Sequence, residues 1–227
     1  MLADRVRMGG GNLKVDDKSG IPGSNMLIAG TMEEGFFGEV PASELITGDA
    51  LASECGISQG TSQHSTAGWL KFAYKGDILF VAKKPIRNSI SWMDLDGSDC
   101  VFGNKNVVIG GLEYKVRLFR GTLNGYSSGA GDRGGKGSEW NKLIHPISIR
   151  AKDNDWRYPE YVDDDLEYWG IDYTDDDLGV VGDGRNSWCQ ESNGTYSRVY
   201  RLLDIVNSTG RTGKLSTTGW RPVLELV

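Results

Sequence analysis

The sequence predicts an α+β protein that is mainly antiparallel β with short helices. Glycine is abundant, with 32 residues against 6 prolines in a chain of 227 residues, which favours a turn-rich fold. Short apolar segments flank hairpin-type turns, and the helix-like segments are also short. These features exclude a long-helix architecture. They predict one domain over residues 31–227, preceded by an extended docking arm over residues 1–30.

The first elements follow from caps and turns. Thr47 precedes a run of good helix formers that closes on Gly56, which predicts a short helix. Segments 69–74 and 78–82 flank Lys75-Gly76-Asp77 and predict a hairpin with a three-residue loop. Segments 107–109 and 112–119 flank Gly110-Gly111, the strongest hairpin signal in the chain.

The second half repeats these signals. Ser138 begins a short capped helix over 138–144 that stops before Pro146. Strands are predicted over 186–191, 198–203 and 219–227, and Pro222 indicates an edge or a bulge in the last of them. Five tryptophans beside these elements are expected in the core: Trp69, Trp92, Trp140, Trp188 and Trp220.

Two glycine-rich segments have no periodicity. The arm, residues 1–30, cannot form a core of its own, so we expect it to dock on a partner chain or a symmetry mate. The loop 121–137 is too long for a plain connector, and we interpret it as a functional or interface loop.

Charge and composition exclude several classes of partner. The net charge of -6 and the pI near 5.0 disfavour nucleic acid. The longest apolar run, 78–82, is far below the roughly 20 residues needed to cross a bilayer, and the N-terminus has no secretory h-region. We therefore expect a soluble protein without membrane insertion, synthesised in the cytoplasm. The 3 cysteines lie far apart, which predicts small buried hydrophobic residues rather than disulfides or a zinc site.

The segment 152–185 is acidic and rich in aromatic residues. Its density of carboxylates can hold Ca²⁺, and the candidate ligands are Asp163, Asp165, Asp175 and Asp177. The spacing does not match an EF-hand, so a solvated acidic face, or N-caps such as Thr174 with Asp177, are alternatives.

Aromatic side chains in the same segment suit sugar recognition. A ring offers a flat apolar face to a pyranose, while carboxylates accept its hydroxyl hydrogens. The candidate ligand-binding residues are Trp156, Tyr158, Tyr161, Trp169 and Tyr173. The alternative is that buried aromatic residues pin an irregular loop.

Signatures of catalysis are weak. The 2 histidines, His64 and His145, have no motif neighbour such as a nucleophile elbow or HExxH. The stretch 129–134 fits GxGxxG but lacks the strand and helix of a dinucleotide site. A hydrolase or depolymerase would need a carboxylate pair such as Asp163 and Asp175. We predict no catalytic residues and no enzymatic activity.

A series of stretches follows in order along most of the chain: 35–40, 47–56, Gly68-Trp69-Leu70-Lys71-Phe72, 79–87, Ile90-Ser91-Trp92, 114–118, Ser138-Glu139-Trp140-Asn141, 177–179, Ser187-Trp188-Cys189-Gln190-Glu191, 198–201 and Gly219-Trp220-Arg221-Pro222-Val223-Leu224-Glu225. Together these stretches resemble a family of tailed-bacteriophage and prophage virion structural proteins of the tail-fibre or minor tail type.

The resemblance implies a C-type-lectin-like domain, a fold that brings its first and last strands together. It also implies location in the virion. The chain lacks the Glu-Pro-Asn and Trp-Asn-Asp calcium-sugar motifs and the disulfide spacing of animal lectins. The related formylglycine-generating enzymes use a cysteine pair that this chain does not match. Neither sugar binding nor enzymatic activity carries over residue by residue.

Two functions follow as hypotheses. The first is a non-enzymatic tail-tip or fibre component that binds a host-surface glycan or protein through loops such as 121–137 and 152–185, and it predicts exposed aromatic residues there. The second is a head decoration or tail-assembly protein whose N-terminal arm contacts other virion proteins. A homotrimer is expected only by analogy with fibres and decoration sites.

Overall fold

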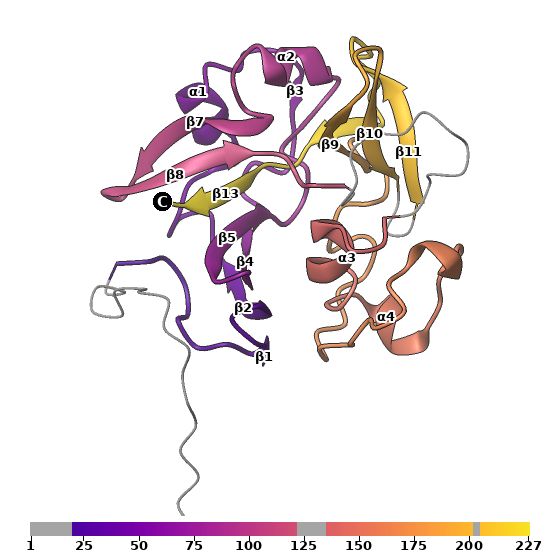
Figure 1. Cartoon of the computed structure of the whole chain (residues 1–227). Helices are drawn as coiled ribbons and strands as arrows, with labels where there is room; N and C mark the ends of the chain where they lie inside the picture. Colours follow the sequence, from indigo (N-terminus) through magenta and orange to yellow (C-terminus); the bar gives the residue numbers. More distant parts are fainter. Residues whose placement is uncertain (1–19, 122–134, 202–204) are drawn as a thin grey trace, which may run out of the picture.

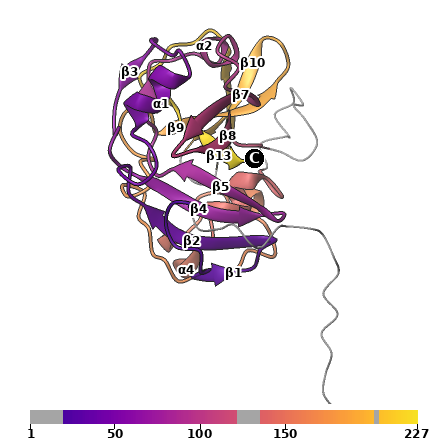
Figure 2. The ribbon, with the colours of Figure 1, turned by 90° about the vertical axis from the view of Figure 1, so that its left-hand side faces the viewer.

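Two sheets organise the chain in the computed structural model, which describes residues 20–121, 135–201 and 205–227 (Figure 1). The first sheet has seven strands, and all of its neighbouring strands are antiparallel. Their order is β1 (Ala29–Gly30), β2 (Glu34–Val40), β4 (Trp69–Tyr74), β5 (Asp77–Ala82), β13 (Val223–Leu226), β8 (Leu112–Arg117) and β7 (Phe102–Ile109). Figure 2 shows β2, β4 and β5 following one another across the lower half of the molecule.

The second sheet has six strands and one parallel pair, between β9 and β12. Its order is β11 (Ile205–Gly210), β10 (Tyr196–Arg201), β9 (Asn186–Ser192), β12 (Thr218–Trp220), β6 (Arg87–Asn88) and β3 (Thr61–Ser62). The helices are short: α1 (Gly48–Glu54), α2 (Trp92–Asp96), α3 (Glu139–Leu143), α4 (Ile149–Asp153) and the 3-10 turn η2 (Pro159–Tyr161). The expected class, α+β and mainly antiparallel β, is confirmed. No helix in the described ranges is long and apolar enough to cross a membrane.

Caps and turns form where the sequence predicts them, but the β4–β5 hairpin has a two-residue loop, Lys75-Gly76, and not the expected three, because Tyr74 pairs with Asp77. Thr47 Oγ1 accepts a hydrogen bond from Ala50 N at 3.2 Å and caps α1, and Ser138 Oγ accepts one from Asn141 N at 3.1 Å and caps α3. Gly110 and Gly111, with φ of 59° and 87°, close the β7–β8 hairpin, because a two-residue turn of this hand needs positive φ at both positions.

The predicted last strand, 219–227, is divided. Arg221-Pro222 interrupts it, so that β12 lies in the second sheet and β13 in the first. Proline has no N–H for a ladder, which is why pairing resumes only at Val223. The expectation that the first and last strands come together is wrong for the described strands: β13 pairs with β5 and β8, whereas β1 and β2 lie at one edge.

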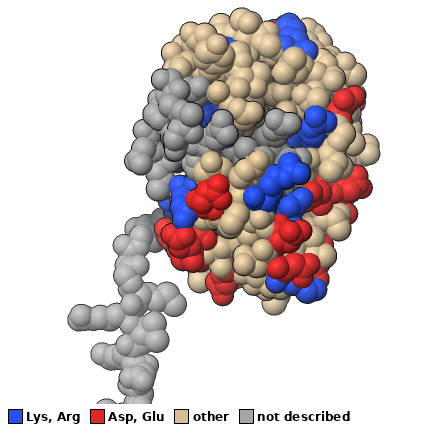
Figure 3. Space-filling model, turned by 90° about the vertical axis from the view of Figure 1, so that its right-hand side faces the viewer, with Lys and Arg blue, Asp and Glu red and all other residues tan. Residues whose placement is uncertain are grey.

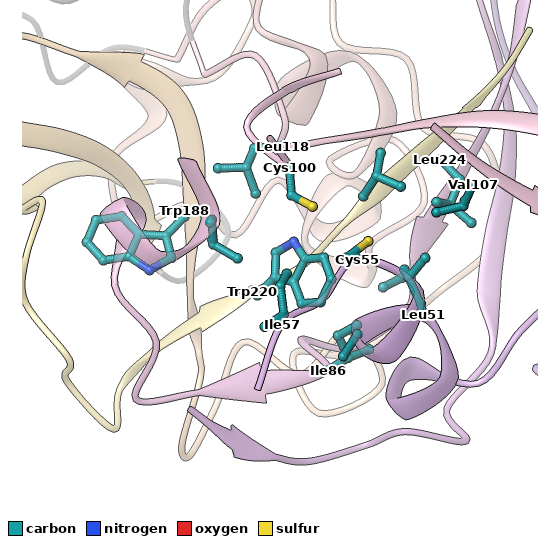
Figure 4. Close-up of a cluster of buried hydrophobic side chains, with 14 of the residues drawn as sticks. Leu51, Cys55, Ile57, Ile86, Cys100, Val107, Leu118, Trp188, Trp220 and Leu224 are labelled. Carbon is teal, nitrogen blue, oxygen red and sulfur yellow. The ribbon is translucent and has the colours of Figure 1, made fainter. Parts of the chain in front are cut away.

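Two apolar clusters form the core. One contains Trp69, Trp92, Trp188 and Trp220, and the other contains Trp140, so all five tryptophans are buried as expected. Figure 4 shows part of the first cluster. The three cysteines are free and buried, as the sequence predicts: Cys55, Cys100 and Cys189.

The described end of the arm is held by its own domain. Lys71, on β4, is only 1% exposed, and its Nζ donates hydrogen bonds to Pro22 O at 2.9 Å, Ser24 O at 2.7 Å and Asn25 Oδ1 at 2.8 Å. A buried ammonium needs such acceptors, since desolvation without partners is costly. The rest of the arm, 1–19, and most of the predicted functional loop, 122–134, lie outside the described residues.

A buried ion group joins α3 to the first sheet. Arg117 Nη1 and Nη2 donate to the two carboxylate oxygens of Glu139 at 2.7 and 2.9 Å, and Arg117 Nε donates to Glu225 Oε2 at 2.7 Å. Burial by itself would lower the pKa of Arg117, but the charges and hydrogen bonds of Glu139 and Glu225 outweigh it and raise the pKa. In the sequence Arg117 alternates with Val116 and Leu118, a pattern typical of a half-exposed strand, yet Arg117 is buried.

A second buried arginine joins β5, β9 and the segment 174–180. Arg221 is fully buried, and it donates to the carbonyl oxygens of Ala82, Lys83 and Leu178 and to Ser187 Oγ. Its guanidinium also lies over the ring of Trp140 at 5.3 Å. Burial lowers the pKa of Arg221 to about 9.

Candidate ligand-binding site

The acidic aromatic segment is held against the loop between α3 and α4. Trp169 N donates to Pro146 O at 2.9 Å and Tyr173 N to Ile147 O at 3.0 Å, while Ile149 N donates to Tyr173 O at 2.9 Å. The segment has little regular structure, so these backbone bonds fix its path. They place residues 163–169 opposite the turn between β1 and β2.

A pocket of about 310 Å³ lies between these two parts of the chain. Glu33 and Glu34 reach it from the start of β2, Asn141 and Lys142 reach it from α3, and the segment supplies Asp163, Asp165, Glu167 and Trp169. Its volume is at the lower end of the range of small-molecule sites, about 300–1,000 Å³. Figure 3 shows charged side chains of both signs gathered on the lower part of one face, where α3 and α4 lie in Figure 1.

Lys142 is the centre of the charges in this pocket. Its Nζ lies 3.1 Å from Asp165 Oδ1, 3.6 Å from Asp163 Oδ2 and 3.9 Å from Glu34 Oε2. Burial acts to lower the pKa of Lys142, but these carboxylates raise it overall. For Glu34, burial and the neighbouring Asp165 and Asp163 raise the pKa despite the ammonium of Lys142.

Asp163 is the most buried carboxylate of the pocket. Its side chain is 5% exposed, and Oδ1 accepts a hydrogen bond from Gly137 N at 2.6 Å. Its Oδ2 accepts none, because Lys142 Nζ at 3.6 Å is beyond hydrogen-bonding distance. Asp163 Oδ2 is therefore a buried oxygen of the pocket that forms an ion pair with Lys142 but accepts no hydrogen bond.

The five predicted aromatic residues do not form one surface. Trp156 is buried in the second core cluster, with its ring 4.6 Å from that of His145, so it does not offer the exposed ring that a ligand contact requires. Tyr158 and Tyr161 stack on each other at 5.8 Å. Trp169, half-buried, is the one of the five that lines the pocket.

Tyr173 belongs to another contact. Its ring lies edge-on to Phe36 at 6.4 Å and beneath Lys83 Nζ at 4.7 Å, and its hydroxyl donates to Glu39 Oε2 at 3.3 Å. Burial and the charge of Glu39 raise the pKa of this phenol. Tyr173 thus fastens the segment to β2, which agrees with the alternative that aromatic residues pin an irregular loop.

The four predicted Ca²⁺ ligands are not brought together. Asp163 and Asp165 surround Lys142, whereas Asp175 forms two hydrogen bonds with Arg150 at 2.8 and 2.6 Å. Asp177 Oδ2 accepts hydrogen bonds from Thr174 N and Oγ1, the N-cap that was the alternative interpretation. Within the described ranges, no group of three or more His, Cys, Asp or Glu side chains could hold a metal ion.

The residues considered for catalysis are also dispersed. His145 is fully buried beside Trp156, and His64 occupies a turn with φ of 47°. Asp163 lines the pocket, whereas Asp175 does not line it and is bound to Arg150. The residues that the sequence analysis missed are Glu33, Glu34, Asn141 and Lys142, which precede the acidic segment and carry no motif.

Comparison with protein-family models, with curated proteins and with solved structures found no match to this chain. The likeness to virion proteins therefore rests on the sequence stretches alone.

Proposed function

We propose that the chain is a non-enzymatic binding protein of a bacteriophage virion, a tail-tip or fibre component that binds a host-surface saccharide in the pocket between β2, α3 and residues 163–169. The observation that supports this proposal is the presence of half-buried Trp169 beside Asp163, Asp165 and Glu167 in one pocket. An indole offers a flat apolar surface to a pyranose ring, and carboxylates accept hydrogen bonds from its hydroxyl groups.

The side chains that line the pocket are held in place by contacts with the rest of the domain, which favours a preformed site. Gly137 N fixes Asp163, the backbone bond to Pro146 O fixes Trp169, and the Arg117–Glu139 ion pair holds α3 against the first sheet. Side chains that are already held in place bind with a smaller entropic cost. A saccharide with many rotatable hydroxyl groups benefits from such preorganisation.

The virion location and the C-type-lectin-like assignment both rest on the resemblance. The pairing of β13 with β5 and β8 does not supply the contact between first and last strands that this assignment implies. Head decoration or tail assembly is the alternative location.

Saccharide binding is tested with the full chain on a glycan array, followed by calorimetry with the best ligand. We expect Trp169→Ala to weaken binding at least about 10-fold, taking as a guide the stacking of a nucleic-acid base on an aromatic side chain, which accounts for about 1–3 kcal/mol. Tyr196→Ala, which removes an aromatic ring that is 47% exposed on β10, is the matched control and should bind like the wild type. Equal affinity of the Trp169 variant, with unchanged near-UV circular dichroism, would contradict the proposal.

Two further measurements test the absence of enzymatic activity and the location in the virion. Incubation with the bound oligosaccharide should leave its length unchanged by mass spectrometry, and cleavage would show an enzyme instead. Antibody-gold labelling of intact particles against 121–137 should mark the tail end. Label over the head would favour the decoration alternative, and particles without label would contradict a virion protein.

A further inference from the structure

We infer that the pocket selects a saccharide carrying a free amino group, so that the ligand class is a cationic amino sugar rather than a neutral or acidic one. This inference rests on the proposed function, because it assumes that a saccharide enters the pocket. It depends on two observations: the balance of charge among the lining residues, and the oxygen of Asp163 that accepts no hydrogen bond.

The balance of charge is strongly negative. Glu33, Glu34, Asp163, Asp165 and Glu167 line the pocket, and among the described residues that line it Lys142 is the only one of opposite charge. This ammonium is shared by three of the carboxylates, at 3.1 to 3.9 Å. Like charges this close repel one another, so a second cation in the pocket is favourable, and a carboxylated or phosphorylated sugar is repelled.

Asp163 Oδ2 indicates where in the pocket the ammonium of the ligand would bind. Oδ1 is satisfied by Gly137 N, while Oδ2 is buried and accepts no hydrogen bond. Its ion pair with Lys142 Nζ, at 3.6 Å, is longer than a hydrogen bond, so a donor carried by a ligand that reaches Oδ2 adds a hydrogen bond that the protein alone does not make. An ammonium has three N–H donors and a positive charge, so it satisfies Oδ2 better than a hydroxyl group does.

Trp169 is the reason to expect an amine carried by a sugar ring. Its indole lines the same pocket as Asp163 and Lys142, so an ammonium on Oδ2 is attached to a ring that can lie against the indole. A bare cation lacks the apolar face that Trp169 contacts. The two features together specify an amine on a sugar ring.

The decisive comparison uses two oligosaccharides that differ in one group. A β-1,4-linked glucosamine tetrasaccharide and its fully N-acetylated counterpart are titrated into the full chain by calorimetry at about pH 6, where amines are protonated. We expect the free amine to bind at least about 10-fold tighter and this preference to decrease with added salt, because charge attraction is screened. Equal binding of the two would overturn the inference and leave the proposed function intact. Absence of binding by both, together with an array on which no saccharide binds, would overturn the proposed function itself.

Matched variants locate the effect. Asp163→Asn keeps the shape of the side chain and an acceptor for Gly137 N but removes the charge, and we expect it to abolish the preference for the amine. Asp164→Asn is the control: this neighbouring carboxylate is 91% exposed, pairs with Lys136 at 2.5 Å and does not line the pocket. Glu34→Gln provides a second variant should Asp163→Asn not fold.

Two results would locate the preference elsewhere and overturn the inference. In the first, the preference for the amine survives both Asp163→Asn and Glu34→Gln. In the second, a lysine-containing peptide competes as well as the amino sugar, which would show that the pocket recognises an amine of a protein.

Discussion

Replacement of Glu139 by glutamine tests how much the buried ion group contributes to stability. The side chains of Arg117 and Glu139 are 4% and 2% exposed, so neither charge is solvated in the folded state. Glu139 accepts three hydrogen bonds, from Arg117 Nη1 and Nη2 and from Arg120 N. Glutamine keeps the size of the side chain but loses the charge, and its amide N–H₂ points a donor where an acceptor is needed.

The expected loss of stability depends on the contacts that Arg117 keeps in the variant. Removal of one partner of a buried ion pair typically lowers the free energy of unfolding by about 3–5 kcal/mol, because the other charge stays buried and uncompensated. Arg117 still contacts Glu225 at 2.7 Å, so we expect the lower end, about 3 kcal/mol. That is a large fraction of the total stability of a typical domain, about 5–15 kcal/mol.

Urea unfolding followed by tryptophan fluorescence measures this cost. The control is Glu113→Gln on β8, an exposed carboxylate that accepts one hydrogen bond from Asn106, for which we expect a change within about 0.5 kcal/mol. A loss below about 1 kcal/mol for Glu139→Gln, with an unchanged m-value, would refute the argument. A double variant, Arg117→Met with Glu139→Leu, should cost less than the sum of the single changes, since no buried charge is left unpaired between them.

Three further predictions concern other contacts. Arg221→Lys should lower the free energy of unfolding by about 2–4 kcal/mol, because one ammonium cannot reach acceptors on three separate segments. Thermal unfolding tests this, with Arg185→Lys, at a partly exposed position, as the control. Equal melting temperatures of the two variants would contradict the prediction. Hydrogen bonds from Thr174 hold the pKa of Asp177 below its ordinary value of 3.8. The stability that they add is therefore present above that value and is lost as the pH falls through the lower pKa of the folded state. The free energy of unfolding between about pH 4 and pH 2 should depend less on pH in Asp177→Asn than in the wild type, and identical profiles would refute this. Lys71→Met should increase hydrogen exchange over residues 22–28 while the exchange of β4 and β5 changes little, and unaltered protection of 22–28 would show that other contacts hold them.

Local signals in the sequence predicted local structure well. The caps at Thr47 and Ser138 and the turn at Gly110-Gly111 depend on residues within a few positions of one another, and each forms as expected. The strand β2 is not evident from the sequence because glycines at 35 and 38 interrupt its apolar pattern, whereas Ser91 and Asp94 form a capping box at the start of α2 that the sequence analysis does not include.

The site was less predictable, because its residues come from distant parts of the chain. The acidic segment pointed to Asp163, Asp165 and Trp169, but nothing local indicated that Glu34 and Lys142 would face them. Buried cations were a further difficulty. Lys71, Arg117 and Arg221 look like surface residues in a strand pattern, and only the tertiary structure shows the acceptors that make their burial tolerable.

The division of the last strand at Pro222 has a consequence for how the molecule assembles. Residues 218–226 supply β12 to one sheet and the interior strand β13 to the other, with register partners such as Val81 and Asn88 far earlier in the chain. Neither sheet can reach its final strand order before this one segment docks, and such distant pairings slow folding because a long loop must close first. The two sheets are thus coupled through one segment, and loss of this segment removes an interior strand from each of them.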